Sequence, residues 1–201
     1  MGILNNIFFT FCIIVVVNPI HGQQTTTKPL TISVFTVATQ LPGGKLLPIH
    51  PGLEIGTEFK LNKSHKRQWF QTAKFGVFHH RLSQTAIMIY SENGFRPSIY
   101  KGLSADIKIG MGYLHSIPDL QTFSLREGSY EKKSNLGRPQ FKVSFAFGLG
   151  WSLGKETTSP RIFAVMQSIF QMPFIKSYVP LLPNTAIHLG VSFPFFNLKK
   201  D

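Results

Sequence analysis

The residues whose types and spacing could support catalysis are few, and the closest approach to a catalytic pair is His115-Ser116. A histidine base activates a serine hydroxyl only when the two side chains lie within hydrogen-bond reach of each other. Alternate residues of a β-strand share a face, whereas adjacent residues point to opposite faces. In a regular strand His115 and Ser116 therefore point apart. They are the best candidates in the chain for a base and a nucleophile, but they do not meet this requirement, and we do not expect catalysis.

The other histidines and the glycine pairs favour structural roles. His79 and His80 have no further ligand at a spacing typical of zinc sites, which favours a pair at the rim of the fold over a metal site. His188 lies among small residues in an alternating segment, where we expect a buried, hydrogen-bonded side chain. The glycine pairs at 110–112 and 148–150 lack the third glycine and the strand-to-helix context of a dinucleotide site. We expect neither a metal nor a cofactor.

The secondary structure that positions these residues is indicated most clearly by residues 141–153, in which apolar and small or polar residues alternate strictly. Every odd position, from Phe141 to Leu153, is large and apolar, and every even position is small or polar. A period of two places the two sets on opposite faces of a strand. At roughly 3.3 Å per residue the segment reaches about 43 Å, enough to cross a bilayer at a tilt of ~40°. The segment therefore predicts one transmembrane strand of a β-barrel.

Similar alternation recurs along the chain and predicts an all-β fold, an eight-stranded antiparallel transmembrane up-and-down barrel over 49–197. The predicted strands are 50–61, 69–80, 85 to about 96, 103–115, 122–131, 141–153, 161–174 and 184–195. The even count suits a bacterial barrel. An open sheet edge in hydrocarbon leaves unpaired backbone groups that cost several kcal/mol each. We therefore predict that 184–195 pairs with 50–61.

The composition agrees with a membrane barrel. Charged residues make up 15% of the 201 residues, against about 25% in average soluble domains. The mean hydropathy is only +0.06 because apolar and polar residues alternate. No run of about 18 apolar residues occurs, which argues against a helical membrane protein. A soluble lipocalin-like barrel is the alternative, but it would expose glycine, serine and alanine along 141–153, where a solvated face carries Lys, Glu and Asp.

The N-terminal residues resemble an export signal. An apolar run at 7–17 is followed by Asn18-Pro19, and we expect residues 1–22 to be a signal peptide that is cleaved. The alternative, a short membrane anchor, is disfavoured because the run is too short to span a bilayer as a helix. Cys12, the only cysteine, lies in this segment. Residues 23–48 then form a leader in which Leu30–Ala38 resembles a strand, and we leave open whether it is a periplasmic tail, an extra strand or a plug.

The predicted strands place several charged residues on the inner face, where they can neutralise one another. The predicted interior network comprises Glu54, Glu58, Lys60, Lys74, Asp106, Lys108, Lys142 and His188. Eight strands enclose just enough room for side chains. We therefore expect a narrow, packed polar lumen rather than an open pore.

The pattern resembles the small eight-stranded outer-membrane β-barrel proteins of Bacteroidetes-type bacteria. The resemblance covers about 50–196 and is carried by His50-Pro51-Gly52, Gly110–Leu114, Gly148–Trp151 and His188–Phe193. It implies a place in the outer membrane of a Gram-negative cell and a structural, accessory or interaction role in the envelope. Residues 197–201 depart from the family because a terminal aromatic residue often ends such chains.

Two functions are alternatives to this role, and the same resemblance suggests the first of them. Lipid A deacylases among the small barrels use a His and a Ser on one strand face, which needs a His-x-Ser spacing that this chain lacks. A hydrolase that modifies lipid A or lipopolysaccharide is therefore one alternative. A barrel that binds a small hydrophobic ligand is the other.

The net charge of +12 is consistent with two alternatives, an anionic partner such as the phosphates of lipopolysaccharide or ordinary solvated loops. If the N-terminus is periplasmic, 50–61 runs outward, and the connections 62–68, 96–102, 132–138 and 175–183 lie outside. The residues that we expect to contact lipopolysaccharide phosphates are Lys63, His65, Lys66, Arg67, Lys132, Lys133 and Arg138. The expected partners are outer-membrane lipid and lipopolysaccharide, with a larger outer-membrane complex as a further alternative, and we exclude nucleic acid.

Overall fold

We describe the protein from a computed structural model. It describes residues 28–44, 47–64, 66–81, 83–119, 123–126, 129–132, 136–154, 159–173 and 181–196. The regular structure of these residues is entirely β-strand. Among them, no helix has the length and apolar character needed to cross a membrane.

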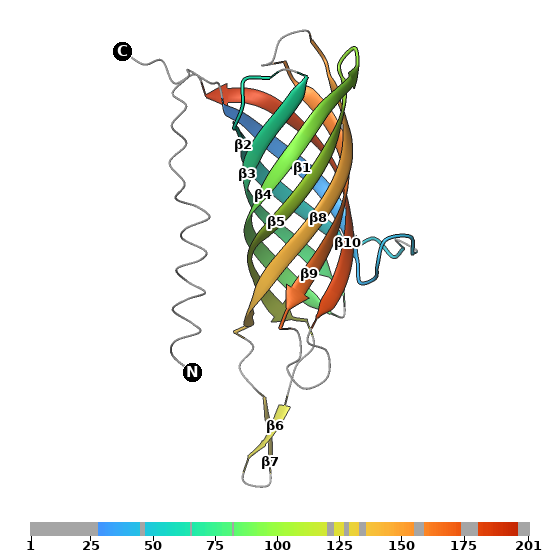
Figure 1. Ribbon diagram of the computed structural model, residues 1–201. Coiled ribbons are helices and arrows are strands. Elements are labelled where there is room, and N and C mark those ends of the chain that lie inside the picture. The colour runs from blue at the N-terminus through green and yellow to red at the C-terminus, as the bar shows by residue number, and fades with distance from the viewer. Residues whose placement is uncertain are drawn as a thin grey trace, which may run out of the picture.

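Eight strands form a closed antiparallel barrel (Figure 1), which confirms the predicted fold class. Their order around the wall is β1, β10, β9, β8, β5, β4, β3 and β2. Their bounds are β1 Lys28–Ala38, β2 Pro51–Lys60, β3 Arg67–His80, β4 Gln84–Tyr100, β5 Leu103–Pro118, β8 Arg138–Ser152, β9 Arg161–Met172 and β10 Leu182–Phe196.

The barrel closes through a strand whose place the sequence analysis left open. β1 pairs with β10 on one side and with β2 on the other, so that Ile32 lies opposite both Val191 and Ile55. The prediction that 184–195 pairs with 50–61 is therefore wrong. The reason lies on the inner face of β1, where Phe35 and Val37 are buried. Because both faces of β1 carry apolar residues, its sequence pattern does not distinguish outward-facing from inward-facing positions, so it was not recognised as a strand of the wall.

The predicted strand 122–131 is not part of the wall. It is replaced by a separate hairpin of β6 (Phe123–Arg126) and β7 (Ser129–Lys132), which stands beyond one end of the barrel (Figure 1). β5 and β8 pair directly, with Met111 opposite Val143, so the wall leaves no gap for another strand. The count stays at eight because β1 takes the place of the segment that the prediction misassigned.

This exchange changes which connections lie together. Lys28 and Phe196 pair with each other, and the connections 61–66, 101–102 and 153–160 lie at the same end of the wall, which we name the terminal end. The connections 39–50, 81–83, 119–137 and 173–181 lie at the opposite end, named the hairpin end. The terminal end is at the top of Figure 1 and β6–β7 at the bottom. The four connections predicted to face outward are thus divided between the two ends.

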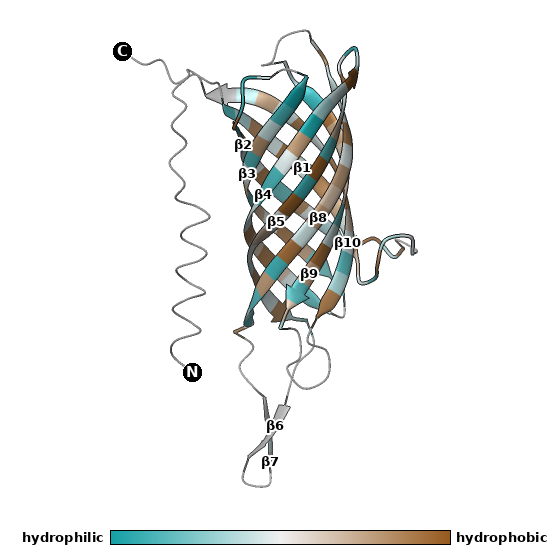
Figure 2. Cartoon of the chain, in the orientation of Figure 1, coloured by the Kyte–Doolittle hydropathy of each residue, from teal (hydrophilic) through white to brown (hydrophobic). Residues whose placement is uncertain are grey.

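The two faces of the wall are as the alternation predicts. On β8, Phe145 is 40% exposed and Ser144 is fully buried, and on β10, Leu189 is 59% exposed and Ser192 only 7%. Figure 2 shows hydrophobic and hydrophilic residues interleaved along the strands. The inverse arrangement, with the large residues inside, is excluded. For β9, whose sequence is apolar on both faces, the structure points Phe163 and the other odd-numbered residues inward.

The interior changes character along the barrel, as the inner face of β4 shows. From the hairpin end, the buried residues are Gln84, then Ala86 and Met88, then Tyr90 and Glu92, and finally Arg96. The apolar layer is completed by Phe35, Val37, Phe78, Leu114, Ile169 and Ala186. An apolar layer therefore separates the hairpin end from the ionised groups, which occupy the middle and the terminal end.

Candidate functional site

The centre of the barrel holds a group of ion pairs around Lys74. Its Nζ lies 2.8 Å from Glu54 Oε1 and 3.2 Å from Glu92 Oε2. Lys108 Nζ approaches the same Glu92 oxygen at 3.8 Å, and His188 Nδ1 lies 3.8 Å from Glu54 Oε1. The Tyr90 hydroxyl also donates a hydrogen bond to Glu54. All these side chains are buried, so each carboxylate depends on the neighbouring cations for its stability.

A second group of ion pairs lies toward the terminal end and is built from two arginines. Arg96 makes a two-pronged contact with Glu58, with both N···O distances at 2.9 Å, and its Nε donates to Asp106 at 2.7 Å. Arg161 donates to the same carboxylate at 3.0 and 3.1 Å and also reaches Ser104. Asp106 thus joins β4, β5 and β9 through paired guanidinium contacts, which are strong and directional.

Lys142 differs from the other interior cations. It is fully buried, and among the described residues its Nζ has no hydrogen-bond partner. The ammonium instead lies 3.1 Å from the centroid of the Tyr90 ring, as a cation–π contact. A buried ammonium without an acceptor is costly, and this contact offsets part of that cost.

The residues predicted as an interior network are distributed over these groups. Glu54, Lys74, Lys108 and His188 belong to the central group, Glu58 and Asp106 to the second, and Lys142 stands apart. Lys60 is half-buried at the last position of β2.

Sequence reasoning missed four ionisable residues of the interior, Tyr90, Glu92, Arg96 and Arg161. On β4, Ser91 and Asn93 interrupt the outward apolar series, which obscured the inward set. Glu92, Arg96 and Met88 all occupy even-numbered positions of β4, which share one face of the strand, and this shared parity could have placed the two charged residues inside.

The candidate catalytic pair is separated by the wall. Ser116 is buried inside and its hydroxyl donates to Gln84, whereas His115 bonds on the other face to the Tyr113 hydroxyl at 2.8 Å and the Leu136 carbonyl at 2.9 Å. The two side chains therefore do not form a base and nucleophile pair.

The residues predicted to contact lipopolysaccharide do not share one end. Lys63, Lys66 and Arg67 lie at the terminal end, and Arg138 begins β8 at the hairpin end. Lys132 ends β7, also at the hairpin end, although its side chain lies outside the described residues. His65 and Lys133 are outside the described residues altogether. The described members of this set therefore lie at opposite ends of the barrel.

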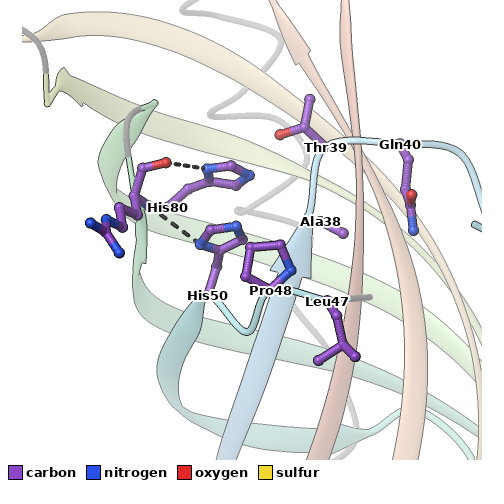
Figure 3. Close-up of a pocket in the computed structure, with 8 residues that line it drawn as sticks. Ala38, Thr39, Gln40, Leu47, Pro48, His50 and His80 are labelled. Atoms are coloured by element: carbon purple, nitrogen blue, oxygen red, sulfur yellow. Dashed lines mark hydrogen bonds between the residues drawn. The ribbon is translucent and has the colours of Figure 1, made fainter. Parts of the chain in front are cut away.

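A recess of about 500 Å³ lies at the rim of the hairpin end. Figure 3 shows its lining residues, which are Ala38, Thr39, Gln40, Leu47, Pro48, His50, His80 and Arg81. The rings of His50 and His80 stack with centroids 3.7 Å apart and planes inclined by 17°. His79, the other member of the predicted rim pair, points elsewhere and contacts the Thr85 hydroxyl at 2.9 Å. In the described parts of the chain, no group of three potential ligands could hold a metal.

The backbone of Arg81 fixes the protonation sites of both stacked rings. Its N–H donates to His50 Nδ1 at 3.3 Å, and its carbonyl accepts from His80 Nδ1 at 3.2 Å. A backbone N–H can only donate and a carbonyl can only accept, so neutral His50 carries its proton on Nε2 and neutral His80 on Nδ1. Burial, followed by the neighbouring rings of His80 and His79, lowers the pKa of His50. The lowered pKa favours the neutral form of His50.

Comparison with known proteins places the fold among outer-membrane barrels. No protein-family model matches the chain, and no curated protein matches it at a significant level. The crystal structure of Neisserial surface protein A (NspA) is similar over 86% of this chain and 100% of that chain, with a TM-score of 0.58 at 7% identity.

Two further structures resemble the chain less. The outer-membrane enzyme PagL matches 83% of this chain and 99% of its own at a TM-score of 0.49 and 11% identity. Ail, the attachment invasion locus protein of Yersinia pestis, matches 84% of this chain and 97% of its own, with a TM-score of 0.46 and 13% sequence identity. The likeness to NspA shows the eight-stranded outer-membrane barrel fold, and the Bacteroidetes type stays a prediction.

Proposed function

We propose that this protein is an integral outer-membrane barrel of a bacterial envelope with a structural or interaction role. The proposal rests on one observation: the outer face of the barrel exposes apolar side chains, whereas the interior holds charged side chains that form ion pairs. A soluble protein rarely exposes a contiguous apolar surface of this extent. In the hydrocarbon of a bilayer such an apolar surface is stable, and a closed barrel wall provides hydrogen-bond partners for its backbone N–H and C=O groups. The fold shared with NspA supports the same assignment.

The lengths of the connections support an orientation with the hairpin end outside the cell. Outer-membrane barrels have short periplasmic turns and longer extracellular loops. The terminal end includes the turn 101–102, whereas the hairpin end includes 119–137, the longest connection of the wall. Lys28 and Phe196 would then lie at the periplasmic end, as expected for an exported chain. Trp69 and Trp151, both about half-exposed near the terminal end, are suited to the periplasmic interface.

In this orientation only part of the predicted cationic set meets the outer leaflet. Arg138 and Lys132 belong to the hairpin end and are our proposed contacts for lipopolysaccharide phosphates. Lys63, Lys66 and Arg67 would face the periplasmic leaflet or the periplasm. The projecting β6–β7 hairpin, with Tyr130 77% exposed, is the part of the outer end that we propose for contact with a protein partner.

Labelling of intact cells tests both location and orientation. Single cysteines are placed at Tyr130 in the hairpin and at Lys101 in the turn of the terminal end, and a membrane-impermeant maleimide is added before and after lysis. We expect Tyr130→Cys to react in intact cells and Lys101→Cys only after lysis. Reaction of Lys101→Cys alone would reverse the orientation, and recovery of the protein in the soluble fraction would reject the membrane location.

The proposed role is tested separately by mild detergent extraction and affinity capture. A chain that captures a reproducible envelope partner, and loses it when 120–135 is replaced by a short turn, supports an interaction role through the hairpin. A chain that always elutes alone argues against it. No observation favours the hydrolase alternative, since His115 and Ser116 lie on opposite faces.

A further inference from the structure

The outer face of the barrel carries a pair of amide side chains on β3 and β4. Gln71 and Asn93 lie opposite each other in the β3–β4 ladder, with Asn93 exposed and Gln71 half-buried. The other asparagines and glutamines of the described wall occupy inward-facing positions; they are Gln68, Gln84, Gln140, Gln167, Gln171 and Asn184. Within the described wall, Gln71 and Asn93 are thus the only amide side chains on the outer face.

Apolar residues surround this amide pair. Along β3, Gln71 lies between the exposed outward residues Trp69 and Phe75, and across the ladder to β5, Asn93 lies opposite Ile109, which is 61% exposed. Trp69 is suited to the periplasmic interface. Gln71 lies two residues closer to the hairpin end, roughly 7 Å along the strand. In the membrane location proposed above, on which this inference rests, the amides therefore lie on the hydrocarbon side of Trp69.

The chain itself provides few hydrogen-bond partners for these amides. Gln71 Nε2 donates to the Ser91 hydroxyl at 3.1 Å, whereas the Asn93 side chain has no hydrogen-bond partner among the described residues. Each amide offers two N–H donors and a carbonyl acceptor. Water would complete these bonds at a soluble surface, but hydrocarbon cannot, and an unpaired amide there is costly. The amides therefore call for polar groups from another protein surface.

We propose that this amide face of β3 and β4 binds the same face of a second copy of the chain within the membrane. An amide both donates and accepts, so two copies related by a two-fold axis can exchange hydrogen bonds between Asn93 of one and Gln71 of the other. A second copy presents its amides on this same face, which favours a self-complementary contact. Ala73 and Ser91, the next pair of the ladder, are small and let the two walls approach closely.

Disulfide crosslinking in phosphatidylcholine vesicles tests the contact. The full chain carries Cys12→Ser and one new cysteine, either Ala73→Cys on the amide face or Ala164→Cys on β9. Both alanines are exposed on the outer face, and β9 lies four strands from β3 in either direction around the wall. After oxidation with copper phenanthroline, we expect severalfold more crosslinked dimer from Ala73→Cys than from Ala164→Cys. This difference should persist as the lipid-to-protein ratio is raised.

Substitutions of Asn93 test whether the amide is responsible. In the chain with Ala73→Cys, Asn93→Leu should lower by about tenfold the lipid-to-protein ratio at which half of the chain is crosslinked. This is the loss expected for two hydrogen bonds between side chains in a membrane. Asn93→Gln keeps an amide at this position and should crosslink like its parent. Heat-modifiable electrophoretic mobility confirms that each variant is folded.

The outcomes separate the contact from the membrane location. Equal crosslinking of Ala73→Cys and Ala164→Cys, or crosslinking that is unchanged by Asn93→Leu, would overturn the contact and leave the location intact. Recovery of the chain in the soluble fraction would reject the location and the contact together.

Discussion

The ammonium of Lys142 lies against the ring of Tyr90 across a glycine, because Gly112 of β5 pairs with Tyr90 on one side and with Lys142 on the other. Lys74 approaches the same ring from β3, at 5.5 Å from its centroid. The two lysines differ in their partners, since Lys74 lies between two carboxylates whereas Lys142 has no ion pair among the described residues. The barrel interior thus contains a paired and an unpaired ammonium against one aromatic ring.

This contrast predicts opposite effects for the same substitution. Lys142→Met removes a buried charge without orphaning a carboxylate, and we expect it to stabilise the barrel by about 1–4 kcal/mol. Lys74→Met leaves Glu54 and Glu92 with fewer cations and should destabilise it by about 3–5 kcal/mol. Urea unfolding of the barrel refolded in lipid vesicles measures both. Equal destabilisation by the two variants would show that Lys142 is as well compensated as Lys74.

Gly112 predicts a steric requirement at the same place. A Cβ at this position would lie 2.4 Å from the carbonyl oxygen of Ile89 and 2.4 Å from Tyr90 Cβ. Gly112→Ala should therefore lower the unfolding free energy by about 1–3 kcal/mol, the usual cost of overpacking. Gly76→Ala is the matched control on β3, because its nearest neighbour at 3.2 Å is the flexible end of Met88. The control should cost clearly less.

The closing role of β1 is tested by deletion. Removing Lys28–Ala38 leaves β10 and β2 without their shared partner, so the shortened chain should lose the heat-modifiable electrophoretic mobility of a folded barrel. Replacing 120–135 by a short turn removes β6–β7 but leaves β5 paired with β8, and this chain should keep that mobility. If the chain without Lys28–Ala38 folds and the chain without 120–135 does not, the barrel wall contains 122–131 instead of β1, as the sequence predicted.

The buried His50 predicts a dependence of stability on pH. Because burial and the neighbouring histidines lower its pKa in the folded protein, the unfolded chain binds a proton more readily below about pH 6.5. The contribution of His50 is thus complete above that pH and is lost as the pH falls through the lowered pKa. Unfolding at pH 7.5 and 5.5 in phosphate-free buffer measures this slope. His50→Asn should flatten it, and His115→Asn, which alters a histidine outside the recess, should leave the His50 contribution in place.

The sequence predicted the fold best where the two faces differ most. Along β8, large residues such as Phe145 alternate with small ones such as Ser144, and the structure follows this pattern. The prediction failed for β1, because Phe35 and Val37 point into the apolar layer of the interior. It also failed for 122–131, where the alternating residues form the β6–β7 hairpin rather than a strand of the wall.

The candidate site depended on contacts that alternation does not encode. The parity of β2 placed Glu54 and Glu58 inside, but their partner strands follow from the pairing of the whole wall. Once β1 entered the barrel, every connection before β6 changed ends, and the predicted cationic surface divided. The stacking of His50 on His80 joins residues from different segments and leaves no local sequence signal.

In the proposed membrane assignment, the large residues of the wall contact lipid while the ionised residues fill the interior. Nitroxide labels attached singly at Phe145, Leu189, Ser144 and Ser192, in the chain reconstituted into vesicles, test it directly. We expect high oxygen and low nickel-chelate accessibility for labels at Phe145 and Leu189, and low accessibility to both for labels at Ser144 and Ser192. High nickel-chelate accessibility at Phe145 and Leu189 would contradict the membrane assignment.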